Sequence, residues 1–274
     1  MEHCRTLLEL FPHAVVAGVL IAAVCAALGV YVILKRIVFI GVALAESAAC
    51  GIALAMTSGV PPFIGAAALT LGVGLGLSRP YESGRLPRDA LLGVIFVAAA
   101  ALSILLVSKA GLGLEEIRGL LYGDLVLARP GDLLVCVAVL VPAALVLLIF
   151  RRPVLYSFLD REVALLLGIK AACWEILFFA VLALTVAAAA RVAGAMLVFA
   201  YLVVAPAAAL LLSRRLAVVL RLAVGVAVTC TLLGLYLALA WDLPANQLIV
   251  ALMCLCLALV AAGKYLRRLF QPVK

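Results

Sequence analysis

Apolar segments of about 20 residues follow one another along almost the whole chain, separated by short polar breaks. That is the length a helix needs to cross the hydrocarbon core of a bilayer. With 69% hydrophobic and 12% charged residues, a chain of 274 residues has too little polar surface for a water-soluble domain. The sequence therefore predicts a polytopic membrane protein. The apolar segments lie at about 14–34, 37–57, 62–78, 90–108, 132–150, 173–190, 194–212, 217–240 and 247–264.

Each segment is predicted to be a helix, because backbone groups in lipid must pair within their own segment unless a closed barrel forms. The ten-residue alternation typical of barrel strands is absent. We expect an all-α transmembrane helical bundle, with residues 1–274 as a single domain. It has nine spans, or eight if the first segment or the short, Gly-rich third one does not cross.

The basic residues predict the orientation of this bundle. Sixteen of the 21 Lys and Arg residues fall in breaks on the side of the C-terminus. By the positive-inside rule, that side is cytoplasmic, and nine spans then put the N-terminus outside. The net charge of +8 thus reflects membrane topology and not nucleic-acid binding. The first residues lack both a basic n-region and a small-residue cleavage site, so the first helix is expected to be retained.

The motifs that would support catalysis are missing. The sequence contains no GxxxxGK[ST] loop to cradle phosphates, no HExxH and no GxSxG. The chain is therefore not expected to be an enzyme, and any ATP that drives it is expected to be hydrolysed by another subunit.

A single carboxylate, Glu46, lies inside the second apolar segment, FIGVALAESAACGIALA. A helix from Ile37 places it about 14 Å from the cytoplasmic end, near the midplane. An acid there costs about 2.5–3.5 kcal/mol on insertion scales, so it should face the bundle interior or a wet cavity. Cys50, one turn on, could offer a thiolate to the same ion or simply pack. Two structural alternatives for Glu46 are a neutral side chain bonded to a facing helix and a tolerated remnant.

The break at 151–172 is predicted to be the longest cytoplasmic loop. Within it, residues 160–169 fit a short helix: Asp160 opens it, Arg161 and Glu162 occupy its first turn, and Gly168 ends it. Such a helix would suit a docking partner, and the alternative is a surface helix that merely links two spans.

Five stretches, in order, resemble the metal-uptake ABC transporter permeases for zinc, manganese or iron, the ABC-3 family of membrane subunits. The most specific is RVAGAMLVFAYLVVAPAAALLLSRRL, which includes Gly194 and Pro206. KRIVFIGVALAESAACGIALA is similar to the family's RRxSLxGDALSHAALPGVALA, with Gly41 and Gly51 in step. The others are LLYGDLVLARPGDLL with Asp124, LDREVALLLGI, and LALAWDLPANQLIV with Asp242.

The resemblance implies a permease in a bacterial inner membrane. It implies three partners: a cytoplasmic ABC ATPase dimer that binds the ATP, a second permease subunit, taken to be an identical copy, and an extracytoplasmic substrate-binding protein. No cofactor is implied in this chain, and a divalent metal is the cargo. Residues 160–169 become the helix that couples to the ATPase, and Glu46, Cys50, Asp124 and Asp242 become candidates for the metal path.

The chain also departs from the family pattern. Val42, Ala45, Glu46 and Cys50 stand where the motif carries Asp, Ser, His and Pro. Glutamate offers oxygen, which favours harder cations than the imidazole nitrogen does. A permease for a metal chelate or a vitamin B12-type cargo is therefore an alternative. A proton-coupled secondary transporter using Glu46 and a membrane scaffold without a path are further alternatives.

Overall fold

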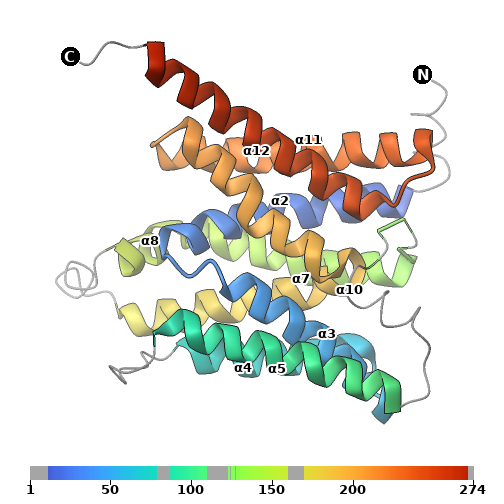
Figure 1. Cartoon of the computed structure of the whole chain (residues 1–274). Coiled ribbons are helices and arrows are strands. Elements are labelled where there is room, and N and C mark those ends of the chain that lie inside the picture. Colours follow the sequence, from blue (N-terminus) through green and yellow to red (C-terminus); the bar gives the residue numbers. More distant parts are fainter. Residues whose placement is uncertain are drawn as a thin grey trace.

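A computed structural model shows an all-helical molecule, as the apolar segments predict (Figure 1). The structure describes residues 12–78, 87–109, 123, 125–126, 128–159 and 170–270. No described residue lies in a strand. The helices are α2 (Pro12–Leu34), α3 (Ile40–Ser58), α4 (Pro62–Ser78), α5 (Arg88–Lys109), α7 (Pro130–Ile149), α8 (Arg151–Leu159), α10 (Ala171–Leu212), α11 (Leu216–Trp241) and α12 (Ala245–Phe270).

Seven of these helices are long and apolar enough to cross a membrane: α2, α3, α5, α7, α10, α11 and α12. The apolar helix α4 has 17 residues, or about 25 Å, which is at the short end of the range for a span. The chain is a multi-pass membrane protein.

The first half of α10 runs antiparallel to α7. Arg191 Nη2 lies 2.7 Å from Oδ1 of Asp132, in the first turn of α7. The ring of Trp174 packs against Phe150, just past the other end of α7, with ring centroids 5.0 Å apart. Residues 171–193 therefore cover the length of one spanning helix.

The second half of α10 returns beside α12. The side chain of Asn246 donates a hydrogen bond to the carbonyl oxygen of Ala193, 3.0 Å away, and Lys264 Nζ donates one to that of Leu211, 2.9 Å away. The two halves meet at Gly194, whose φ of 74° and ψ of 162° interrupt the helix. This combination of angles is essentially restricted to glycine.

The two segments predicted at 173–190 and 194–212 are thus the two halves of α10, and Figure 1 shows the ribbon turning back there. With α4 counted, the described helices make nine crossings. We call the end of the bundle that carries Lys35 and Glu175 the Lys35 end, and the opposite end the Arg191 end. Most described basic residues gather at the first, namely Lys35, Arg36, Arg151, Arg152, Lys170, Arg214, Arg215, Arg221 and Lys264, whereas Lys109, Arg129 and Arg191 lie at the second.

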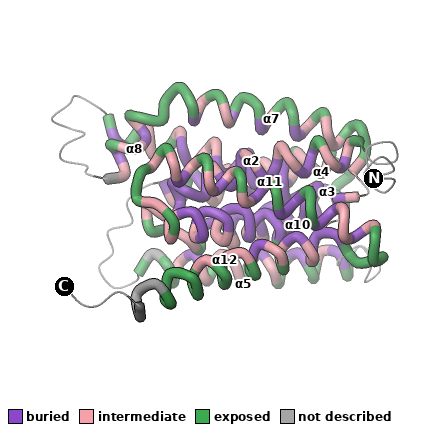
Figure 2. The backbone as a smooth tube through the Cα atoms, turned by 90° about the horizontal axis from the view of Figure 1, so that it is seen from above, coloured by how far each residue is buried: buried purple, intermediate pink, exposed green. Residues whose placement is uncertain are grey.

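The buried centre of the bundle consists of α2, α3 and α10 (Figure 2). Small residues let these helices approach closely, as interfaces between membrane helices require. A Cβ added at Gly29 would clash with the backbone of Leu202, and one at Gly51 would clash with the backbone of Gly65. The outer helices α5, α7, α11 and α12 leave most of their residues at least partly exposed, as suits contact with lipid.

Candidate functional site

Helix α3 holds Glu46, the one charged side chain between Ile40 and Ser58. The helix packs mainly against α4, α5 and α10. Because residues 35–39 form a turn, α3 starts at Ile40 and not at Ile37. Glu46 therefore lies about 9 Å along the helix, nearer the Lys35 end than the sequence predicts.

One oxygen of the Glu46 carboxyl group has no partner in its described surroundings. Its Oε2 atom is buried and has no hydrogen-bond partner among the described residues. A buried polar atom without a partner costs about 1–3 kcal/mol, so such atoms call for an explanation. An acceptor oxygen in this position is available to a cation or to a donor from another molecule.

Glu46 belongs to a stripe on α3 that the chain itself covers incompletely. We call Phe39, Val42, Glu46, Cys50 and Leu54 the α3 stripe, because their spacing of three or four residues puts them on one face. Phe39 is 58% exposed and Leu54 is 45% exposed, whereas Cys50 is buried. The half-buried Glu46 thus lies in the middle of a face that is open at both ends.

The other predicted path residues do not join Glu46. Asp242 is the exposed C-cap residue of α11, with a left-handed φ of 52°, at the Arg191 end. Asp124 lies outside the described residues. Within the part of the chain that the structure describes, no three His, Cys, Asp or Glu side chains gather closely enough to hold a metal ion. The described chain alone therefore does not close a metal cage around Glu46.

The glycines and the proline picked out by the sequence occupy different structural positions. Gly41 packs against the side chains of Leu202 and Phe199. Gly194 breaks α10, and Pro206 is buried inside its second half.

The predicted coupling residues Asp160, Arg161, Glu162 and Gly168 also lie outside the described residues. Helix α8 leads into their segment and Lys170 follows it. Through Phe158, α8 packs edge-on against Phe178 of α10, with ring centroids 4.8 Å apart. Both ends of the segment are therefore anchored to the Lys35 end of the bundle.

The sequence did not predict the contacts of Lys35 at that end. Lys35 Nζ lies 2.9 Å from Glu175 Oε1, and the two side chains are only 10% and 19% exposed. The same nitrogen lies 4.3 Å from the ring centroid of Phe158 and 5.0 Å from that of Phe179. One ammonium group thus ties the α2–α3 turn to both α8 and α10. The only sign of these contacts in the sequence is a lysine directly after an apolar segment. Such a lysine is equally typical of the cytoplasmic end of any spanning helix.

Asn246 is the second residue that the sequence did not reveal. It is 4% exposed and bonds the backbone of two segments, Ala193 in α10 and Leu125, whose N–H donates to the Asn246 side chain over 3.4 Å. A buried amide of this kind fixes where the break in α10 meets the start of α12.

The sequence matches the ABC 3 transport family over residues 8–264. It is 29% identical to the manganese transport system membrane protein MntC of Halalkalibacterium halodurans over 239 residues, covering 87% of this chain and 82% of that protein. It is 28% identical to the chelated iron transport system membrane protein YfeC of Yersinia pestis, covering 88% and 82%. The fold is similar to that of a chain in the structure of PsaBC from Streptococcus pneumoniae in complex with Fab, with a TM-score of 0.83, 22% identity and 94% of both chains covered.

Proposed function

The chain belongs to the ABC 3 transport family, and we propose that it is the membrane-spanning permease subunit of an ABC importer for divalent metal ions. The observation that carries this proposal is the family match along nearly the whole chain, together with relatives named for manganese and iron transport. Manganese and iron are the favoured cargoes, since a glutamate oxygen suits them better than zinc, which prefers nitrogen or sulfur ligands.

The energy is proposed to come from a separate ABC ATPase dimer. This chain has no phosphate-binding loop of its own and needs no resident cofactor for this role. The proposed docking element is residues 160–169, with Asp160, Arg161, Glu162 and Gly168. In support, α8 and Lys170, which flank that segment, lie at the Lys35 end, where the basic residues gather. By the positive-inside rule that end, and with it the C-terminus, faces the cytoplasm of a bacterial cell.

A second copy of the permease is proposed to pack against the α3 stripe. Its half-covered face, with the unpartnered Oε2 of Glu46 in the middle, supports this arrangement. The cargo would then pass between the two copies, with Glu46 as the oxygen ligand and Cys50 beside it. Asp124 and Asp242, towards the opposite end, would draw the cation in from an extracytoplasmic binding protein.

The class of transporter is tested with purified components. The chain alone should show no ATP hydrolysis, and activity should appear only when the cognate ATPase is added. Metal transport by the chain alone in liposomes, at a rate that added ATPase does not change, would refute the proposal.

A permease for a chelated metal is the second candidate, favoured by the similarity to the chelated iron transport protein of Yersinia pestis. A bound chelate would also fit the loss of the motif's histidine and aspartate, because the chelator supplies ligands that the protein lacks. Growth of a metal-starved strain that depends on this permease separates the two: rescue by free metal alone supports the ion, and rescue by the chelate alone supports the chelate.

A further inference from the structure

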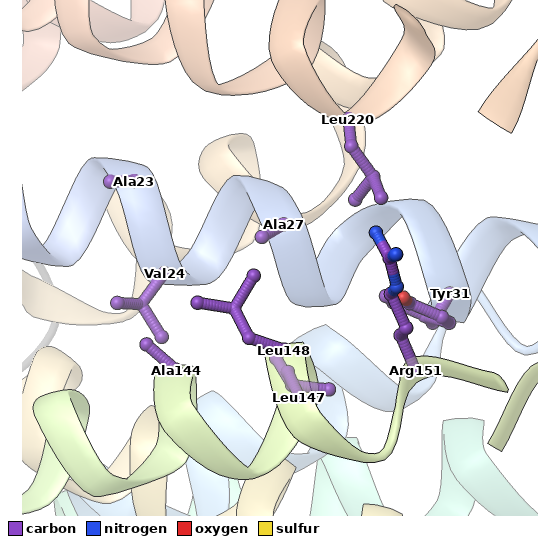
Figure 3. A pocket seen from close by; sticks show the side chains of 9 residues that line it. All are labelled: Ala23, Val24, Ala27, Tyr31, Ala144, Leu147, Leu148, Arg151 and Leu220. Atoms are coloured by element: carbon purple, nitrogen blue, oxygen red, sulfur yellow. The ribbon is translucent and has the colours of Figure 1, made fainter. Parts of the chain in front are cut away.

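A cavity of about 190 Å³ opens between α2, α7 and α11 (Figure 3). Its floor is α2, where Ala23 and Ala27 leave room, and its walls carry Leu148 from α7 and Leu220 from α11. From Ala23 to Tyr31, two turns further on, the cavity runs about 12 Å along α2. Within a bilayer such an apolar cavity fills with hydrocarbon, because water finds no hydrogen-bond partners along these walls.

One end of this cavity is polar. Figure 3 shows the guanidinium of Arg151 and the hydroxyl oxygen of Tyr31 side by side there. Helix α7 has 20 residues, about 30 Å, which is the thickness of the hydrocarbon core. Arg151, the first residue of α8, lies two residues beyond the end of α7 and so at the depth of the lipid headgroups.

The charged side chains that the structure describes around that end are basic. The neighbouring Arg152 is exposed, and Arg221 follows Leu220 on α11. Among the described residues, neither Arg151 nor Arg152 has an acidic partner within ion-pair distance; the described pairs are Lys35–Glu175 and Arg191–Asp132. A guanidinium binds phosphate oxygens well, through several N–H groups in a fixed plane.

We propose that this cavity is a binding site for an anionic phospholipid. One acyl chain lies along α2 between Leu148 and Leu220, and the phosphodiester accepts hydrogen bonds from Arg151 and Tyr31. A net negative headgroup is selected over a zwitterionic one because the choline of phosphatidylcholine would bring a second positive charge towards Arg151. Since α2 packs against both α7 and α11, the lipid fills the space that these three helices leave between them.

The test is native mass spectrometry of the detergent-purified, delipidated full-length protein, titrated with phosphatidylglycerol or phosphatidylcholine of the same acyl chains. We expect tighter binding of phosphatidylglycerol. Arg151→Gln should weaken it about tenfold, as expected for the loss of hydrogen bonds from a charged group. The matched control Arg152→Gln, which removes the same charge one residue away and outside the cavity, should weaken it no more than about twofold.

A second pair of variants tests the acyl-chain part of the site. Ala27→Phe fills the cavity and should abolish retention of phosphatidylglycerol, whereas Ala240→Phe, at an exposed position of α11, should not. Equal binding of the two lipids, equal losses in Arg151→Gln and Arg152→Gln, or unchanged binding in Ala27→Phe would each overturn the proposal. These measurements need neither ATPase nor metal, so their outcome is separate from that of the proposed transport function.

Discussion

The contacts of Lys35 show how many elements of this protein a single side chain can hold together. Lys35 holds Glu175 by an ion pair and faces two phenylalanine rings, all with little exposure to solvent. Partners that bind an ammonium group away from water contribute more than a surface pair does. The α2–α3 turn, the start of α10 and α8 are therefore held in one arrangement at the end where an ATPase is proposed to dock.

We expect this pair to be energetically coupled. In a double-mutant cycle with Lys35→Met and Glu175→Gln, the coupling energy should be about 1 kcal/mol or more. Stability is measured by heating the detergent-solubilised protein and recording the loss of its monodisperse peak in size-exclusion chromatography. Arg152→Gln, at an exposed position of α8, is the control and should change the stability by less than about 0.5 kcal/mol. Strictly additive effects of the two substitutions would show that the contact is incidental.

At the scale of elements, close crossings between helices depend on glycine, which has no side chain. Gly51 of α3 and Gly65 of α4 each leave no room for a Cβ against the other's backbone. Gly51→Ala should force the helices apart and destabilise the protein by about 1–3 kcal/mol. Gly72→Ala is the matched control, because Gly72 lies on α4 with nothing within 4 Å of an added Cβ. Equal melting temperatures for the two variants would argue against close packing at this crossing.

The break in α10 also depends on a single glycine. At Gly194, φ is 74° and ψ is 162°, angles that cost an L-residue about 1–3 kcal/mol. The backbone of Gly194 also lies close to Gly123, where an added Cβ would clash with it. Gly194→Ala should therefore lower the melting temperature, with Gly225→Ala, which has open space, unaffected. A Gly194→Ala protein as stable as the Gly225→Ala protein would mean that the break relaxes at little cost.

The elements themselves were largely predictable, since segments such as 62–78 are nearly continuous apolar stretches bounded by Pro and Arg. The start of α3 was less so, because the turn at 35–39 includes Arg36 with a φ of 59°, which hydropathy does not register. Contacts between distant residues were not predictable at all. Lys35 and Glu175 are 140 positions apart, and Asn246 reaches back to Ala193, so only the packing of α2, α10 and α12 brings these groups together.

At the scale of the whole molecule, charge and topology agree. Nine crossings put most described basic residues at the Lys35 end, which is the distribution the positive-inside rule predicts. The candidate path was predictable only in part. The sequence singles out Glu46, but whether a neighbouring helix covers it follows from packing, and the α3 stripe proves to be half open. A second molecule against that stripe is what we propose to complete the site in the assembled importer.

The most direct test is uptake of radioactive manganese into proteoliposomes that contain the permease, its cognate ATPase and its binding protein. Wild-type uptake should require ATP, and Glu46→Gln should reduce it by about tenfold or more, because even groups one step removed from a metal contribute 10- to 100-fold to its affinity. Asp89→Asn, which removes an exposed acid in the first turn of α5, should retain wild-type uptake in an equally assembled complex. Wild-type uptake by Glu46→Gln, or uptake that proceeds without the ATPase, would contradict the account.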